Sequence, residues 1–400
     1  MGLQLCQLCE IAYFVTDKIP LEKVLLTDYV TTDSLLPNKE GRCVAQNLPP
    51  QKCALTHYKC GDVLVANIRP YLKKIWFADR EGGASADVLV FRAKSGHSQE
   101  FLYASLLQDS FYDYVMKGKK GSKMPRGDKA QIMRYSIPKL SLAEEACIGN
   151  IILSFCTMIN VNRRINDNLE AMAKQLYDYW FVQFDFPNEE GKPYKSSGGA
   201  MVWNEKLKRM IPQGWNNGIL SDVANITMGQ SPDGSSYNEL GEGSIFYQGS
   251  TDFGLRFPSI RQYTTSPNRC ANKGDILMSV RAPVGALNIA NNDCCIGRGL
   301  SALSSKICSI THLYYLMNDF RLKFEGMNSA GTTFGSITKD ELFNLPVVIP
   351  TKSVISELEK VCEPIFDKQM IIGEEINVLT KQRNELLPLL MNGQATVNSD

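Results

Sequence analysis

Two long stretches repeat apolar side chains at spacings of three and four residues, and this pattern constrains the fold more than any other feature. In the first, the series is Ile148, Ile151, Phe155, Met158, Ile165, Leu169, Met172 and Leu176, with Asn162 taking one turn. In the second, it is Ile355, Leu358, Cys362, Ile365, Ile372, Ile376, Leu379, Leu386 and Leu390, interrupted by Gln369 and Arg383. A sustained 3.5-residue period predicts a long helix that pairs with another helix. Core helices of one ordinary domain are the alternative, but such helices average only about 10 to 14 residues.

The segments outside these helices form two blocks with matching order. The run GDVLVANIRP at 61–70 corresponds to GDILMSVRAP at 274–283. In each block a loop rich in Gly, Ser, Thr or Lys follows, at 118–127 and 331–335, and leads to a strand and a proline. An internal period of roughly 210 residues indicates a tandem duplication and a molecule with approximate two-fold symmetry.

We predict an α+β chain in four segments. These are a first block at 1–142, a helical segment at 143–187, a second block at 188–350 and a helical segment at 351–400. An exposed linker is expected at 184–200, of which 188–200 starts the second block. Strands are expected at 87–91, 134–137 and 275–280, and helices at 101–114 and 311–323. If the two long helices pair antiparallel, they separate the two blocks.

Charge is unevenly distributed, although the whole chain carries a net charge of only +1. Residues 1–142 hold 20 Lys and Arg against 14 Asp and Glu, whereas each helical segment has three more acidic than basic residues. The helices therefore carry the acidic excess, which leaves the blocks free to present basic faces. Because the N-terminus lacks a basic leader and no eighteen-residue apolar run is found, a cytoplasmic protein without a membrane span is expected.

The sequence lacks the usual signatures of a catalytic or metal site. Twelve scattered cysteines are typical of reduced thiols. Cys6 and Cys9 form a CxxC that Cys53, His57 and Cys60 could complete as a zinc site, but the second half lacks a standard ligand spacing. The run GKKGSK at 118–123 lacks the GK[ST] ending of a phosphate-binding loop. We therefore expect no catalytic residue, no metal and no cofactor bound by this chain.

Two glycine-rich loops are the positive signal for nucleic acid. In the first, at 116–129, six of fourteen residues are basic, namely Lys117, Lys119, Lys120, Lys123, Arg126 and Lys129. Interleaved glycine lets the backbone approach a phosphate chain. The alternative is a solvated charge run. The second loop, at 328–336, carries hydroxyls that include Thr332 and Thr333, and equivalent loops in both blocks favour DNA binding.

Several motifs occur in a recognisable order and spacing. They are LYDYWFVQFDFP at 176–187, SGGAM at 197–201 ahead of IPQGW at 211–215, GDILMSVRAPVG at 274–285, IGRGLSAL at 296–303 and LLPLLMNG at 386–393. In this order the chain resembles the DNA specificity subunits of type I restriction-modification enzymes over essentially its whole length. The first block departs from the pattern, because it opens without an Ile-Pro-x-Gly-Trp motif and has SADVL at 85–89 where the second block has Arg-Gly-Leu.

The resemblance implies two target recognition domains, each reading one half of a bipartite target in double-stranded DNA. It also implies two helical regions that dock two modification subunits, and no catalytic site in this chain. S-adenosylmethionine is then expected on the modification subunits, and ATP and Mg on restriction subunits that join the complex. A stand-alone DNA methyltransferase or nuclease and a coiled-coil scaffold without DNA contact are the alternatives.

The candidate functional residues fall into two sets. Besides the two loops, the DNA-binding candidates are Arg69, Lys73, Lys74, Gln230, Ser231, Arg256, Arg281 and Arg298. Arg and Gln can pair bidentately with guanine and adenine, which makes Gln230, Arg281 and Arg298 candidates for reading bases. The candidates for helix pairing and subunit docking are Ile151, Phe155, Met158, Asn162, Ile165, Leu169, Leu176, Ile365, Ile372, Ile376, Leu379 and Leu386.

Overall fold

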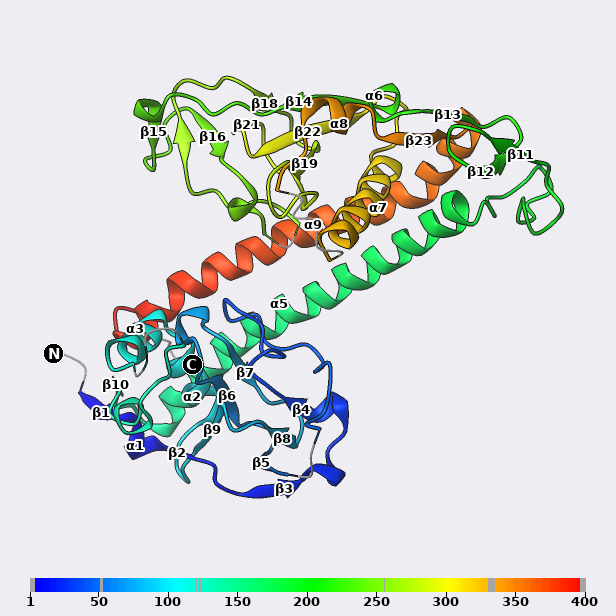
Figure 1. The fold of residues 1–400 in the computed structure, drawn as a ribbon. Coiled ribbons are helices and arrows are strands. Elements are labelled where there is room, and N and C mark those ends of the chain that lie inside the picture. Colours follow the sequence, from blue (N-terminus) through cyan, green and yellow to red (C-terminus); the bar gives the residue numbers. More distant parts are fainter. Residues whose placement is uncertain are drawn as a thin grey trace. The chain divides into compact units, whose positions relative to one another are not determined.

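The computed structural model describes residues 4–50, 53–119, 121, 124–254, 256–329 and 335–395, with side chains at 326–329 left out (Figure 1). It divides into two compact units, unit 1 formed by 1–163 with 375–400 and unit 2 formed by 164–374. Helices α5 (Leu142–Tyr177) and α9 (Lys352–Met391) each contribute to both units. The two long helices and the mixed α and β content predicted from the sequence are therefore confirmed.

Unit 1 contains two four-stranded sheets. The first has the order β2-β9-β6-β7, formed by Ala12–Phe14, Val88–Ala93, Val63–Ala66 and Ile75–Phe77, and every neighbouring pair is antiparallel. The second has the order β3-β5-β8-β4, formed by Lys18–Pro20, Ala54–Tyr58, Gly82–Ala84 and Tyr29–Val30. Strands β1 (Leu5–Gln7) and β10 (Ser136–Pro138) form a separate pair. The short helices are α1 (Leu8–Ile11), α2 (Gln99–Leu107), α3 (Asp109–Lys117) and α4 (Lys129–Ile132).

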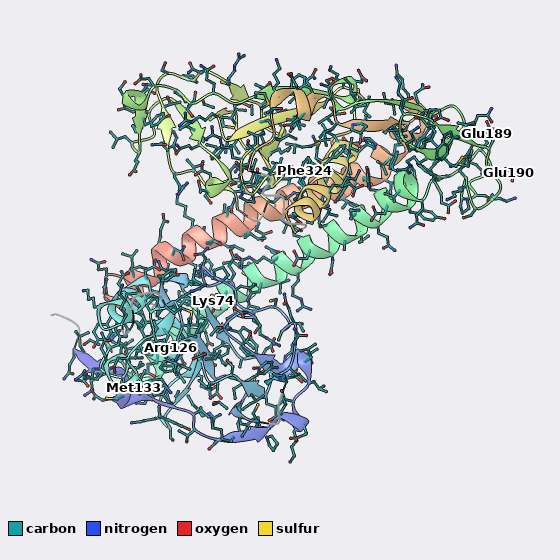
Figure 2. All side chains as sticks on the ribbon, viewed as in Figure 1. Lys74, Arg126, Met133, Glu189, Glu190 and Phe324 are labelled. Carbon is teal, nitrogen blue, oxygen red and sulfur yellow. The ribbon has the colours of Figure 1, made fainter. Side chains whose placement is uncertain are left out.

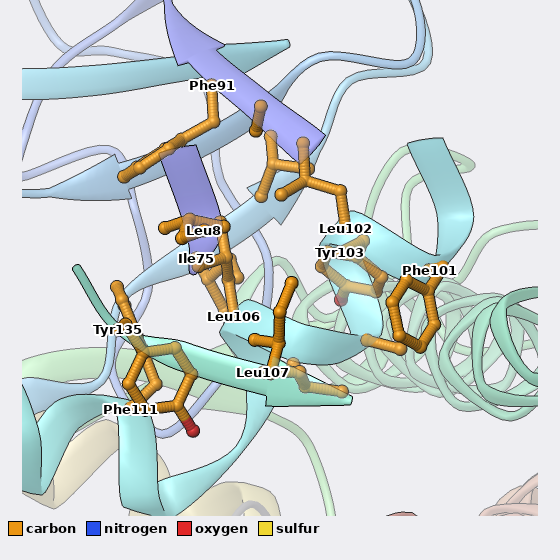
Figure 3. Packing of buried hydrophobic residues seen from close by; sticks show 14 of the residues in the cluster. Leu8, Ile75, Phe91, Phe101, Leu102, Tyr103, Leu106, Leu107, Phe111 and Tyr135 are labelled. Carbon is orange, nitrogen blue, oxygen red and sulfur yellow. The ribbon is translucent and has the colours of Figure 1, made fainter. Parts of the chain in front are cut away.

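The strand pattern of the first sheet explains how unit 1 builds its core. Successive side chains of a strand point to opposite faces, so Leu89 and Phe91 join the helix-side cluster while Val88 and Val90 join a second cluster. Phe91 and Ile75 of the sheet belong to the same buried cluster as Phe101, Leu102 and Leu106 of α2 (Figure 3). Because both faces of the sheet are covered, Val88 to Phe91 of β9 are all apolar and do not alternate with polar residues.

Unit 2 repeats this arrangement with its own strands. The four-stranded sheet has the order β14-β22-β19-β20, formed by Ala224–Met228, Leu300–Ser305, Ile276–Ser279 and Leu287–Ile289. The second sheet is β15-β17-β16-β21-β18, formed by Tyr237–Asn238, Tyr263–Thr264, Ser244–Tyr247, Cys294–Ile296 and Cys270–Ala271. The pair β13 (Asn216–Ile219) and β23 (Pro346–Ile349) matches β1 and β10. The other elements are α6 (Leu220–Val223), α7 (Ile310–Ser329), α8 (Lys339–Phe343) and the hairpin β11 (Met201–Asn204) to β12 (Arg209–Pro212). The first sheet has the same strand order in both units, which agrees with the predicted repeat, whereas the second sheet has four strands in unit 1 and five in unit 2.

Two local predictions need correction. The helix expected at 101–114 is broken at Gln108, whose extended backbone (φ −63°, ψ 144°) separates α2 from α3. The segment expected as an exposed linker is anchored by aromatic packing, since Phe184 and Phe186 are buried and Phe186 stacks on Trp215 with 5.0 Å between ring centroids. A count of Gly, Ser and charge missed these aromatic anchors at the start of the segment.

The buried line of α5 is shifted by one residue from the predicted line. Met158 and Ile165, predicted to pair with the second helix, are 48% and 39% exposed. The buried series is instead Ile148, Ile152, Cys156, Ile159, Asn166, Ala173 and Tyr177. Asn166 and Ala173 add little to an apolar series, whereas the neighbouring positions are Ile165 and Met172, which is why the sequence pattern selected that line. Of the remaining predicted positions, Ile151, Phe155, Asn162, Leu169 and Leu176 are half-buried.

The buried line of α9 agrees with the prediction. Ile372, Ile376 and Leu379 are buried, and Ile365 and Leu386 are half-buried. The two predicted polar interruptions, Gln369 and Arg383, are only 1% and 5% exposed. Within unit 1, Arg383 Nη1 lies 3.9 Å from Cys156 Sγ, and within unit 2, Gln369 Nε2 donates to Glu170 Oε2 at 2.9 Å. Polar groups therefore face α5 from the buried line of α9.

Helix α5 also contains a long apolar stretch. Over eighteen residues within Leu142–Val182 the mean hydropathy reaches 1.5, and 33% of that window is buried. By length and composition this stretch could cross a membrane, which corrects the expectation that no such run is present. The core helix of a soluble protein satisfies the same criteria.

Candidate nucleic-acid interface

Strand ends bring three of the predicted base-reading residues to one edge of the four-stranded sheet in unit 2. Ser279 of β19 pairs with Leu300 of β22, and Met228 of β14 pairs with Ser301. The C-terminal ends of β14 and β19 therefore meet the N-terminal end of β22. Gln230 and Arg281 follow the first two strands, Arg298 precedes the third, and all three are exposed. The topology thus groups residues that are up to 68 positions apart in sequence.

Backbone contacts fix the loops that carry these side chains. The Gln230 N–H donates to Ile296 O at 3.0 Å, and the Arg298 N–H donates to Ser231 Oγ at 3.3 Å. A Cβ atom at Gly229 would lie 2.2 Å from Gly297 O, so only glycine permits this approach. The loops are therefore held by main-chain geometry, which leaves the long side chains free to contact a ligand.

Three further polar side chains lie at the same edge and were missed by the sequence analysis. The Gly297 N–H donates to Tyr247 O at 2.8 Å, which places the exposed Gln248 next to this loop. The Ile296 N–H donates to Arg269 O at 2.8 Å, and Arg269 and its neighbour Asn268 are exposed. No local pattern marks these residues, because only the pairing of β16 and β18 with β21 brings them there. We call Gln230, Ser231, Gln248, Asn268, Arg269, Arg281 and Arg298 the unit 2 edge.

The segment around Arg281 joins the edge to a second loop. The Val280 N–H donates to Gly299 O at 2.9 Å, and the Ala282 N–H donates to Gly335 O at 3.1 Å. Arg281 itself forms an isolated β-bridge with Ser336, and both are exposed. The two predicted hydroxyl residues of this loop, Thr332 and Thr333, lie outside the described residues.

Unit 1 has the same framework at the corresponding sheet edge. The Asn67 N–H donates to Asp87 O at 2.9 Å, and Ile68 forms an isolated β-bridge with Arg126. Arg126 is labelled in Figure 2, and its Nη2 lies 3.1 Å from Asp87 Oδ1. Arg69 is exposed and adopts a left-handed backbone with φ of 53°. We call Arg69, Asp87 and Arg126 the unit 1 edge.

The basic loop that follows α3 presents its described cations to solvent. Lys117, Lys119 and Lys129 are exposed. Asp128 caps α4 by accepting hydrogen bonds from the Ala130 N–H at 2.9 Å and the Gln131 N–H at 3.1 Å, so the loop ends at a fixed point. Lys120 and Lys123, also predicted here, lie outside the described residues.

Lys73 and Lys74 have internal partners and are less suited to DNA contact than predicted. Lys73 and Lys39 both pair with Asp109 Oδ1, at 2.6 and 2.9 Å. Burial opposes ionisation of Asp109, but hydrogen bonds from the two lysines outweigh it and hold the pKa of this carboxyl below its usual value. Lys74, labelled in Figure 2, donates to Thr32 O. Both lysines therefore tie the segment after η3 (Pro70–Leu72) to its surroundings.

Arg256 is not a surface residue, which corrects its prediction as a DNA contact. It is 8% exposed, and its Nη1 lies 3.2 Å from Glu170 Oε2 of α5. Its guanidinium also lies over the rings of Tyr314 and Phe366, 5.5 and 5.0 Å from their centroids. A charge enclosed in this way cannot reach a phosphate or a base.

Within the described parts of the chain, no three His, Cys, Asp or Glu side chains are grouped so that they could hold a metal ion. All twelve cysteines are among the described residues, and each is a free thiol.

Comparison with known proteins adds independent information on the family. Residues 212–386 match the family model described as "Type I restriction modification DNA specificity domain". A putative type I restriction enzyme specificity subunit, MjaX of Methanocaldococcus jannaschii, is 29% identical over 75% of this chain and 68% of its own length. The type I restriction enzyme HindI specificity subunit of Haemophilus influenzae is 22% identical over 92% of this chain and 94% of its own. The crystal structure of a type I restriction-modification S subunit from M. genitalium shares the fold, with a TM-score of 0.61 and 14% identity over 98% of this chain and 96% of that one.

Proposed function

We propose that this chain is a DNA specificity subunit of a type I restriction-modification enzyme and that it reads a bipartite DNA target without a catalytic site of its own. The observation that carries the proposal is the repeated sheet edge. Both units use the same strand ends and the same backbone contacts, and both present exposed arginine side chains there. A duplicated framework with different polar side chains suits a protein that recognises two different half-sites.

The chemistry of the unit 2 edge supports base reading. Arginine pairs bidentately with guanine, and glutamine or asparagine pairs with adenine, in the major groove. The unit 2 edge has three exposed arginines, Arg269, Arg281 and Arg298, beside the amides of Gln248 and Asn268. In unit 1, Lys117, Lys119 and Lys129 are suited to phosphate contacts, which set position and affinity rather than sequence.

We propose that the two long helices form an antiparallel coiled coil between two recognition domains. Support comes from pairs inside each unit, because Cys156 lies by Arg383 in unit 1 and Glu170 by Gln369 in unit 2. From the first pair to the second, the residue number increases along α5, from 156 to 170, and decreases along α9, from 383 to 369. The proposed recognition domains are 1–142 and 188–350, and the proposed helical regions are 143–187 and 351–400.

A stripe of exposed apolar side chains on α5 is the proposed docking surface for modification subunits. Met158, Val161, Ile165 and Met172 are 48%, 46%, 39% and 53% exposed, at spacings of three, four and seven residues. They therefore lie along one face of the helix, and the predicted docking residues Met158 and Ile165 belong to this face. Two modification subunits that use S-adenosylmethionine, and restriction subunits that use ATP and Mg, complete the proposed cytoplasmic complex.

The proposal is tested by expressing the chain with its neighbouring modification subunit and sequencing the methylated DNA. The expected result is methylation at one split sequence with a fixed spacer, and none when this chain is left out. Methylation by the isolated chain with S-adenosylmethionine would instead support a stand-alone methyltransferase. Methylation at the same sites without this chain would overturn its assignment as the specificity subunit.

A further inference from the structure

We infer that a cluster centred on Arg256 positions the second recognition domain on the long helices and thereby sets how narrowly the protein selects the half-site spacing. The Arg256 cluster consists of Arg256, Phe257, Glu170, Phe366, Gln369 and Gly373, all in unit 2. The inference rests on the proposed function, and it assigns a role to buried residues that do not touch DNA.

Arg256 joins three elements through one guanidinium. Its Nη1 pairs with Glu170 of α5, and its face lies over Phe366 of α9 and Tyr314 of α7. Its side chain is 7% exposed, and among the described residues Nε and Nη2 have no hydrogen-bond partner. The aromatic rings therefore supply the remaining contacts of a buried cation. A planar guanidinium held in this way fixes the orientation of the Arg256 segment relative to the three helices, and a lysine side chain would not reproduce this.

Phe257 and Gly373 form an apolar contact next to this ion pair. Phe257 is 5% exposed, and a Cβ atom added at Gly373 would lie 2.4 Å from Phe257 Cε2 and 3.1 Å from Cζ. Glycine is unfavourable inside a helix, so its presence in the middle of α9 is explained by this close approach. The ring of Phe257 therefore lies directly on the backbone of the helix.

Glu170 links the two long helices to each other as well as to the domain. Its Oε2 accepts from Gln369 Nε2 at 2.9 Å and from Arg256 Nη1 at 3.2 Å. Glu170 is 35% exposed and Gln369 is buried. Such polar pairs between helices contribute little net stability, but they can specify one pairing register of the two helices. Because the same carboxylate binds the domain and the partner helix, the register of the helices and the seating of the domain are fixed together.

The rigidity of this contact matters because half-site spacing is read as geometry. Adding or removing one base pair between the half-sites changes the distance between them by about 3.4 Å. It also rotates one half-site relative to the other about the DNA axis by about one tenth of a turn. A domain seated through an ion pair, a guanidinium over two aromatic rings and a ring against the helix backbone tolerates such a change poorly. A loosened domain tolerates it better.

The test uses the full chain with its modification subunit and a DNA library whose half-sites are separated by the parental spacer or by spacers one or two base pairs shorter or longer. Gly373→Ala displaces Phe257 and raises helix propensity, and Arg256→Lys keeps the charge but removes the planar fork. Glu374→Ala is the matched control, because Glu374 adjoins Gly373 and its ion pair with Lys273, at 3.8 Å, is exposed to solvent. Methylation rates and thermal unfolding are measured for each protein.

We expect the preference for the parental spacer over its neighbours to fall by about tenfold in Gly373→Ala and Arg256→Lys, since misplacement of about 1 Å can change rates up to about 100-fold. The half-site bases stay unchanged, and Glu374→Ala behaves as the parent. If thermal unfolding shows that one variant does not fold, the spacer preference of the other variant tests the inference. Folded variants with the parental spacer preference would overturn the inference, as would a change in the bases read. A parent that directs no methylation at any split site would instead overturn the proposed function.

Discussion

The two units build the same sheet edge from the same backbone contacts but place different side chains on it. In unit 1 the Asn67 N–H reaches Asp87 O, and in unit 2 the Val280 N–H reaches Gly299 O, both at 2.9 Å. Asp87 also binds Arg126 through its side chain. Gly299 has no side chain, so the position equivalent to Asp87 offers no carboxylate to Arg281 or Arg298 in unit 2.

This difference separates what the duplication keeps from what it varies. Strand order, the β-bridges at Ile68 and Arg281, and the helix that covers the sheet are retained because they hold the core. The side chains that point outward from strand ends do not affect packing, so they can change without loss of the fold. Recognition can therefore diverge between the units while their architecture stays the same.

The strongest test of this comparison exchanges a whole domain. Replacing residues 200–345 with the corresponding domain of a relative should replace one half of the methylated sequence completely and leave the other half intact. The reason is that both sheet edges are built within their own unit. The methylated sites are compared by sequencing, with an exchange of the same domain for itself through the same junctions as control. A change in both halves would contradict independent reading.

A buried histidine distinguishes the interiors of the units and predicts a dependence of stability on pH. Ser98 caps α2 by accepting from the Phe101 N–H at 3.1 Å, and Ser309 accepts from the His312 N–H at 3.0 Å in the equivalent position. Unit 2 thus has histidine where unit 1 has phenylalanine. His312 is 2% exposed and packs on Phe181 with 4.7 Å between ring centroids, and burial lowers its pKa to about 4.

Because the folded pKa lies below the unfolded value of 6.5, the unfolded state binds the proton more readily between these values. Stability is therefore fully present above pH 6.5 and is lost as the pH falls toward 4, by up to about 3 kcal/mol. His312→Phe, which copies unit 1, should remove this loss in urea unfolding at pH 7 and pH 4.5. His57→Gln is the control, because its side chain is 24% exposed. An unchanged pH dependence in His312→Phe would show that other groups control acid stability.

Single arginines of the unit 2 edge should affect one half-site only. Because Arg can pair bidentately with a base edge, Arg298→Ala is expected to reduce discrimination at one base of that half-site by about 1 to 3 kcal/mol, or about 5-fold to 160-fold. Competition binding with base-substituted duplexes measures this directly. Lys273→Ala, an exposed cation outside the unit 2 edge, serves as the control. An equal loss of affinity for all sequences would mean that Arg298 contacts phosphate rather than a base.

The sequence predicted elements and their repetition better than it predicted which side chains are buried. Heptad spacing located both long helices and matched motifs located the repeat, because both can be read directly from the order of residues along the chain. It chose the wrong line of α5, since the buried line uses Cys156, Asn166 and Ala173. It also placed Arg256 at the surface, because a charge buried against Glu170 is visible only once four distant segments are brought together. Gln248, Asn268 and Arg269 were missed for the same reason, since strand pairing places them at the edge.

The smallest expected effect concerns the basic loop of unit 1, which has no charged counterpart among the described residues of unit 2 at 335–338. Changing Lys117 and Lys119 to Ala should weaken binding of all duplexes by several-fold without altering the bases read, because phosphate contacts carry no sequence information. Each lost contact should reduce the slope of log K against log salt by about 0.9, so the double variant loses up to about 1.8. Binding is measured between 50 and 200 mM salt, a range over which such slopes are readily resolved. Lys206→Ala/Lys208→Ala, two cations in the hairpin β11–β12 that precedes the unit 2 sheet, is the matched control and should keep the parental slope. If the loop variant keeps that slope too, its lysines are a solvated charge run, and the electrostatic difference between the units has no part in DNA binding.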